Sequence, residues 1–131
     1  MHHFAFPKAE HLTSRREIEA LFSKGSMAAY KFPLRAIFHI SNSESVPVKV
    51  LISVSKRHFK HAVDRNRAKR QIREAYRLHK QVLWDTACAQ GTSLHIAFLW
   101  TANMPMDSDK VTRSVISLLE TISTHLQNSR P

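Results

Sequence analysis

The segment from residue 59 to residue 83 constrains the fold more than any other part of the chain. It contains neither Gly nor Pro, so we expect one long helix there. Between Lys56 and Lys80, ten Lys and Arg residues are opposed by only Asp64 and Glu74, which leaves a local charge of +8. At about 100° per residue, six of these cations fall within an arc of roughly 140° on the helix. The six are Arg65, Lys69, Arg70, Arg73, Arg77 and Lys80.

The side of this helix opposite the cations is mostly apolar, which would allow it to pack on a sheet. Like charges four residues apart destabilise an isolated helix by roughly a few tenths of a kcal/mol per pair, and a bound anion would relieve that cost. A merely solvated face normally mixes charge signs. We therefore expect a polyanion as ligand, although the charges do not choose between RNA and DNA. The apolar arc consists of Ala68, Ile72, Ala75, His79 and Val82.

The whole chain shares this charge bias, with 20 Lys and Arg against 10 Asp and Glu in 131 residues and a formal net charge of +10. We expect a single domain, residues 1–131, with a core at about 12–127 and disorder in the first dozen residues and over 127–131. No apolar run approaches the roughly 20 residues of a membrane-spanning helix. The N-terminus lacks the features of a secretory signal, so a cytoplasmic protein is expected. We expect Cys88, the one cysteine, to be a small buried hydrophobic residue.

The remaining segments show strand and helix signals in turn. A helix is expected over residues 14–24, before Gly25, and strands over residues 32–40 and 46–55, joined by a polar turn at 41–45 into an antiparallel hairpin. The apolar run 94–100 predicts another strand, and residues 107–109 can cap a helix that continues to Leu126. The order is αββαβα, or the same with one more short strand near residues 26–30.

Two neighbouring motifs resemble the bacterial ribonuclease P protein family. Ser53-Val54-Ser55-Lys56-Arg57 matches the family's S-V-S-K-[KR] strand end, and residues 62–74 match A-V-x-R-N-x-x-K-R-x-x-R-E on a helix. The resemblance implies an α+β single-domain αβββαβα sandwich (ribosomal protein S5 domain 2-like) with a four-stranded sheet. It also implies that the basic helix lies in a left-handed β-α-β crossover, where general rules alone favour a right-handed one.

The same resemblance implies a function. Members are the protein subunit of ribonuclease P, which binds the catalytic RNA and the 5′ leader of precursor tRNA and assists Mg²⁺-dependent removal of the leader. The chemistry is expected from the RNA, which would also hold the Mg²⁺. No cofactor bound by the protein alone, no membrane and no obligate protein partner are expected. The resemblance and the charges together give the expected RNA-binding residues, which are Lys56, Arg57, Lys60, Arg65, Asn66, Arg67, Lys69, Arg70, Arg73 and Arg77.

By resemblance, a cleft between the sheet and the first helix takes the leader. Aromatic rings backed by positive charge commonly grip single-stranded RNA. The candidates for base stacking are Phe22, Tyr30, Phe32 and Phe38, and for Phe22 and Phe32 the alternative is burial in the core. Two positions depart from the family pattern. Ile18 stands where an aromatic residue is frequent, and residues 58–61 replace a glycine, so that loop needs another backbone path.

The sequence shows no catalytic centre and no metal site of its own. Its ten acids form no close cluster of the kind that a two-metal nuclease needs. The nine histidines are scattered, and we expect His58 and His61 to contact phosphate or solvent rather than zinc. Two other classes stay open, a structural RNA-binding protein of the ribosomal type and a protein-only nuclease.

Overall fold

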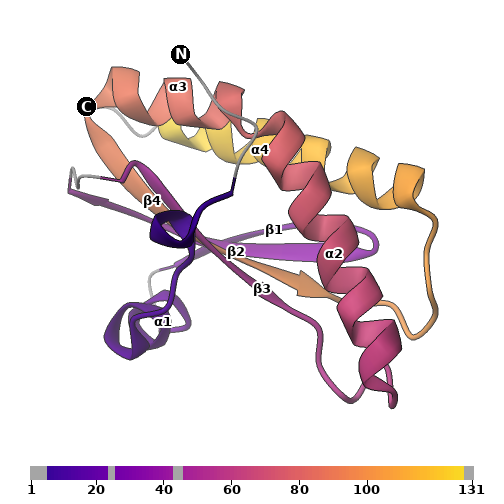
Figure 1. The fold of residues 1–131 in the computed structure, drawn as a ribbon. Coiled ribbons are helices and arrows are strands. Elements are labelled where there is room, and N and C mark those ends of the chain that lie inside the picture. The colour runs from indigo at the N-terminus through magenta and orange to yellow at the C-terminus, as the bar shows by residue number, and fades with distance from the viewer. Residues whose placement is uncertain (1–5, 24–25, 43–45, 129–131) are drawn as a thin grey trace.

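The computed structural model describes residues 6–23, 26–42 and 46–128. The chain folds as an α+β domain in which helices α2 (Ala62–His79), α3 (Gln81–Gln90) and α4 (Ser108–Asn128) cover one face of a sheet. Helix α1 (Arg15–Leu21) lies on the other face (Figure 1). The strands are β1 (Met27–Lys31), β2 (Leu34–Asn42), β3 (Val48–Ser53) and β4 (Thr92–Trp100), arranged in the order β1-β2-β4-β3.

Strand β4 lies in the centre of the sheet, antiparallel to β2 and parallel to β3. The predicted hairpin of β2 and β3 is therefore wrong, because β4 separates these strands. Residues 93–98 of β4 are all buried, and an interior strand between covered faces provides that burial. A hairpin joins β1 to β2 instead, which confirms the short strand near residues 26–30. The parallel β3–β4 connection runs through α2 and α3, and its hand stays a prediction.

The predicted helix over residues 59–83 is wrong at both ends. Helix α2 begins at Ala62, and the chain turns at Lys80 into α3, which was not expected. Leu83 and Ala87 of α3 lie in the core. His79 and Val82 are exposed, although they lie on the predicted apolar arc.

Lys80 itself is buried and pairs with a residue at the other end of the chain. Its Nζ lies 2.7 Å from Glu10 Oε1 and 5.0 Å from the centroid of the Trp84 ring. Glu10 belongs to a short 3-10 helix, η1 (Lys8–Glu10), and Phe6 before it packs edge-on against Tyr76. The expectation of disorder in the first dozen residues is therefore wrong for residues 6–12.

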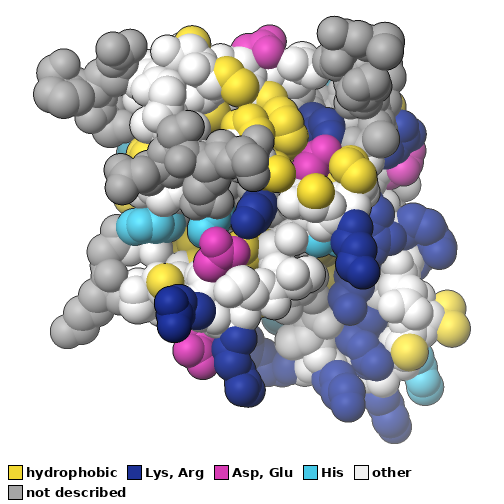
Figure 2. Space-filling model, turned by 60° about the vertical axis from the view of Figure 1, so that its left-hand side comes forward, with side chains coloured by type: hydrophobic (Ala, Val, Ile, Leu, Met, Phe, Trp, Pro, Cys, Tyr) yellow, Lys and Arg dark blue, Asp and Glu magenta, His cyan; other side chains and the backbone are white. Residues whose placement is uncertain are grey.

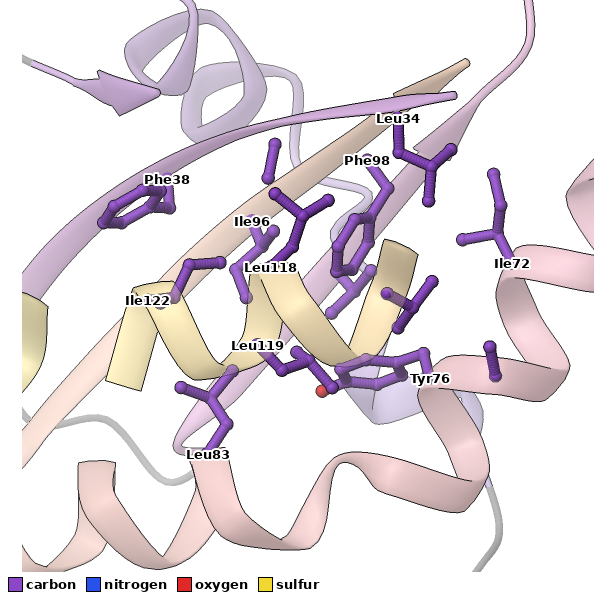
Figure 3. Close-up of a cluster of buried hydrophobic side chains, with 14 of the residues drawn as sticks. Leu34, Phe38, Ile72, Tyr76, Leu83, Ile96, Phe98, Leu118, Leu119 and Ile122 are labelled. Atoms are coloured by element: carbon purple, nitrogen blue, oxygen red, sulfur yellow. The ribbon is translucent and has the colours of Figure 1, made fainter. Parts of the chain in front are cut away.

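The core lies between the sheet and helices α2, α3 and α4 (Figure 3). Ala68, Ile72 and Ala75 face it as predicted, and Tyr76 joins them. Burial raises the pKa of the Tyr76 hydroxyl far above its usual range, so Tyr76 stays neutral. Its oxygen accepts a hydrogen bond from Trp84 Nε1 at 3.1 Å.

Further predictions about helices have different outcomes. Asp107 caps α4 as expected, since its Oδ1 accepts from the Lys110 amide at 2.8 Å. Cys88, expected in the core, is exposed, because α3 turns Leu83 and Ala87 inward and the next residue lies about 100° further round the helix. Helix α1 ends at Leu21 with Phe22 as its C-cap, so the predicted continuation of this helix to residue 24 is wrong. Gly25 and the predicted turn at residues 43–45 lie outside the described residues.

Candidate RNA interface

The cations of the loop before α2 and of the first half of α2 form one surface, here called the arginine face. Figure 2 shows Lys and Arg side chains gathered along the right-hand side of the view. Asp64 is the only acid between residues 56 and 73. A one-signed surface rich in Arg suits paired contacts with phosphate oxygens. The arginine face consists of exposed Lys56, Arg57, Lys60, Asn66, Arg67, Arg70 and Arg73 and of half-buried Arg65 and Lys69.

The arginine face as defined here ends at Arg73, because the next two cations of the helix have acidic partners. RNA binding by Arg77 stays a prediction. Arg77 donates from Nε to Glu74 Oε2 at 3.2 Å and also from Nη2 to Glu74 Oε1. These hydrogen bonds lower the pKa of the Glu74 carboxyl below its usual value. Glu74 therefore partly neutralises the charge of Arg77. Lys80 is buried and contributes no charge to the surface.

The loop between β3 and α2 follows a path that needs no glycine. The Ser55 carbonyl accepts from the amides of His58 at 3.1 Å and Phe59 at 3.4 Å, and Phe59 is buried beside Trp100. Arg65 Nη1 then donates to the carbonyls of Phe59 at 2.8 Å and Lys60 at 3.0 Å. No described residue other than glycine has a positive φ. Arg65 therefore positions this loop in addition to any contact with RNA.

The face of the sheet on which α1 lies, here called the open face, carries polar and basic residues. Tyr30 of β1 and Arg35 of β2 are register partners and are both exposed. Because side chains alternate along a strand, Arg35 and His39 point away from the face that buries Leu34, Ala36 and Phe38. Apolar and polar residues alternate along residues 34–40 apart from Ile37, and this pattern alone places Arg35 and His39 on the same side of the strand.

Helix α1 is tied to the open face by a carboxylate between two basic residues. Glu17 lies 3.8 Å from Lys49 Nζ of β3 and 3.8 Å from His95 Nε2 of β4. The apolar contacts of α1 centre on buried Leu21 with Leu12 and Ala97. Ile18, which stands where the family often has an aromatic residue, packs against this cluster.

The four candidates for base stacking differ in exposure and in the side of the sheet on which they lie. Tyr30 is 61% exposed on the open face, and Phe22 is 47% exposed at the end of α1. Phe32 is 41% exposed but lies beside α4, where the Lys110 Nζ is 5.8 Å from the centroid of its ring. Phe38 is fully buried under α4, so its assignment to the leader cleft is wrong. Two of the four therefore belong to the side of the sheet that α1 occupies.

Neither His58 nor the acids build a metal site in the described part of the chain. His58 Nδ1 donates to Asn103 Oδ1 at 2.7 Å. Within residues 6–23, 26–42 and 46–128, no three His, Cys, Asp or Glu side chains gather where they could hold a metal ion. None of the helices that the structure describes is long and apolar enough to cross a membrane.

The fold and the arginine face together define a small basic α+β protein built to bind a polyanion. A sequence profile described as Ribonuclease P matches residues 6–123. The chain is 35% identical over 127 residues to the ribonuclease P protein component of Porphyromonas gingivalis, covering 96% of this chain and 92% of that one. It is 39% identical over 82 residues to that of Chlorobaculum tepidum, covering 60% and 53%. The chain belongs to the ribonuclease P protein family, which implies RNA binding and a part in tRNA processing.

Solved structures agree on the fold. The RNase P protein of Staphylococcus aureus superposes with a TM-score of 0.67 at 21% identity, covering 88% of this chain and 96% of that one. The RNase P protein of Thermotoga maritima also gives a TM-score of 0.67, at 20% identity, covering 86% and 96%. The predicted α+β class with a four-stranded sheet is confirmed.

Proposed function

We propose that this protein is the RNA-binding subunit of a cytoplasmic ribonuclease P. It binds the catalytic RNA through the arginine face and the 5′ leader of precursor tRNA through the open face. The observation that carries this proposal is the set of exposed cations between Lys56 and Arg73. Asp64 is the only acid in this segment. Such a charge footprint is typical of proteins that neutralise several phosphates at once.

The open face supports the second half of the proposal. Unpaired bases stack on exposed aromatic rings, and nearby cations hold the backbone. Tyr30 with Arg35 opposite it offers this combination on β1 and β2, and Phe22 adds a ring at the end of α1. Because α1 and α2 lie on opposite faces of the sheet, the protein can contact the catalytic RNA and the leader at the same time.

The protein contributes binding energy to the reaction in this proposal. By resemblance, hydrolysis belongs to the RNA, where Mg²⁺ would activate water and stabilise the leaving oxygen. The arginine face reduces repulsion between the phosphates of the two RNAs. Contacts with the leader exist only while the leader is attached, so they favour precursor over mature tRNA.

The test compares the affinities of precursor and mature tRNA for the catalytic RNA, with and without the protein. We expect the protein to increase the preference for precursor by about tenfold or more, because stacking contributes about 1–3 kcal/mol per base. Equal affinities would contradict leader binding and favour a structural RNA-binding protein of the ribosomal type. Mg²⁺-dependent cleavage by the purified protein without RNA would contradict the assignment of hydrolysis to the RNA.

Tyr30→Ala tests the open face directly. We expect the variant to reduce the preference for precursor tRNA by about tenfold, because a stacking ring is lost. Thermal unfolding should change little, since this side chain is mostly exposed. Phe32→Ala is the matched control, because it removes an exposed ring that lies beside α4 instead. If the two variants behave alike in the tRNA binding assay, the leader does not contact Tyr30.

A further inference from the structure

A pocket of about 160 Å³ opens at the outer edge of β3, between the N-terminal segment and Arg73 at the end of the arginine face. We propose that it holds one unpaired nucleobase of the bound RNA, whose phosphate contacts Arg73. This inference rests on the proposed function, because it requires RNA on the arginine face. The residues that carry it are Phe6, His11 and Thr13 of the N-terminal segment, Leu51 and Ile52 of β3, and Arg73 of α2.

The aromatic wall of the pocket is held in place before any ligand arrives. The rings of Phe6 and His11 are stacked, with centroids 4.1 Å apart and planes inclined by 18°. His11 Nε2 lies 3.3 Å from the Phe6 carbonyl oxygen, and the Phe6 ring meets Tyr76 edge-on at 5.3 Å. The Glu10–Lys80 pair anchors the segment between the two rings. A ligand therefore meets a preformed apolar surface, which lowers the cost of ordering the site.

The strand edge supplies hydrogen-bonding groups beside this wall. The Leu12 amide donates to the Val50 carbonyl at 2.9 Å, so the backbone groups of Val50 face away from β4. Backbone direction alternates along a strand, and Ile52 therefore presents its N–H and C=O to the same outer edge. After Leu12 the chain turns into α1, and no backbone partner for Ile52 at this edge occurs among the residues that the structure describes. One donor and one acceptor side by side match the edge of a base.

Size and charge favour a single nucleotide over other ligands. A protein cavity of about 150 Å³ accommodates a benzene ring, so this pocket can take one base ring but not a folded peptide segment. Apolar walls suit a base, and the exposed guanidinium of Arg73 suits its phosphate. Unpaired RNA bases are commonly splayed out and bound in this way.

The position of the pocket explains which nucleotides can reach it. Leu51 belongs to the apolar cluster under α1, whereas Ile52 packs on the core under α2 and α4. The pocket therefore lies where the edge of the sheet separates the arginine face from the open face. An RNA strand that runs from one surface to the other along this edge passes the pocket, and either the catalytic RNA or the leader can supply the base.

Filling the pocket is the decisive test. Thr13→Trp places a large ring at an exposed position of the pocket wall without removing a core contact, and Thr121→Trp at an exposed position of α4 is the matched control. We expect Thr13→Trp to weaken either binding of the catalytic RNA or the preference for precursor tRNA by about tenfold, with an unchanged melting temperature. Loss in the first assay identifies a base of the catalytic RNA, and loss only in the second identifies the leader. Unchanged values in both assays overturn the inference.

A second measurement does not depend on filling the pocket. Cys88 is the only cysteine, so Thr13→Cys in a Cys88→Ser background carries a photo-crosslinker at the pocket alone. We expect crosslinks concentrated at one unpaired nucleotide of the assembled complex, whereas crosslinks spread over paired regions overturn the inference. If the unmodified protein does not bind the catalytic RNA at all, the proposed function fails, and that result differs from a selective failure at the pocket.

Discussion

The Arg67→Ala, Arg70→Ala double variant is expected to bind the catalytic RNA about 100-fold more weakly than the unmodified protein at moderate salt. Both side chains are exposed, and neither has an ion-pair partner in the part of the chain that the structure describes. A hydrogen bond to a charged group contributes about 1.5 kcal/mol or more, and about 1.4 kcal/mol corresponds to a tenfold change. The slope of log affinity against log salt should decrease by about two.

A control double variant tests whether the loss of affinity comes from the arginine face or only from the change in net charge. Arg15→Ala with Arg113→Ala removes the same two charges from exposed positions on α1 and α4. We expect this control to retain nearly all of its affinity for the catalytic RNA when no tRNA is present. Equal losses in the two double variants would show that net charge, and not the arginine face, determines assembly. Thermal unfolding of both variants verifies that the fold is retained.

Phe38→Ala is expected to lower the free energy of unfolding by about 3–5 kcal/mol, the usual cost of removing a buried phenyl ring. Phe38 is fully buried, and its ring centroid lies 5.5 Å from that of His125. Denaturant unfolding measures this change. The folded fraction should keep its preference for precursor tRNA, because the ring does not reach the open face.

Tyr30→Ala should give the opposite result, with little loss of stability and a reduced preference for precursor. The two variants together therefore separate the core from the leader surface. If Phe38→Ala reduced the preference while leaving stability unchanged, the assignment of the two faces of β2 would be wrong.

Local patterns in the sequence predicted most of the elements and the centre of the candidate site. Apart from Ile37, apolar and polar residues alternate along residues 34–40, and the two faces of β2 follow that pattern: Leu34, Ala36 and Phe38 are buried, and Arg35 and His39 are exposed. The alternation does not say which face the helices cover, and Phe38 was therefore assigned to the wrong surface. The density of cations located the arginine face because charge is a property of composition and helical spacing.

The errors arose where the outcome depends on residues distant in the chain. Lys80 continues the cationic arc in the sequence, yet its partner Glu10 lies 70 positions away and draws it into the interior. The pairing of β2 and β3 with β4, rather than with each other, is equally non-local. The pocket at the edge of β3 combines the N-terminal segment, a strand and a helix, and no single motif marks it.

The position of β4 also determines when the domain can form. Strand β4 pairs with both β2 and β3, and it is translated after α2 and α3. Both strands therefore leave the ribosome before the strand that lies between them has been made. Loop closure over such separations is slow compared with local pairing. An isolated β1–β2 hairpin is at best marginally stable, so cooperative folding of the sheet awaits synthesis of residues 92–100.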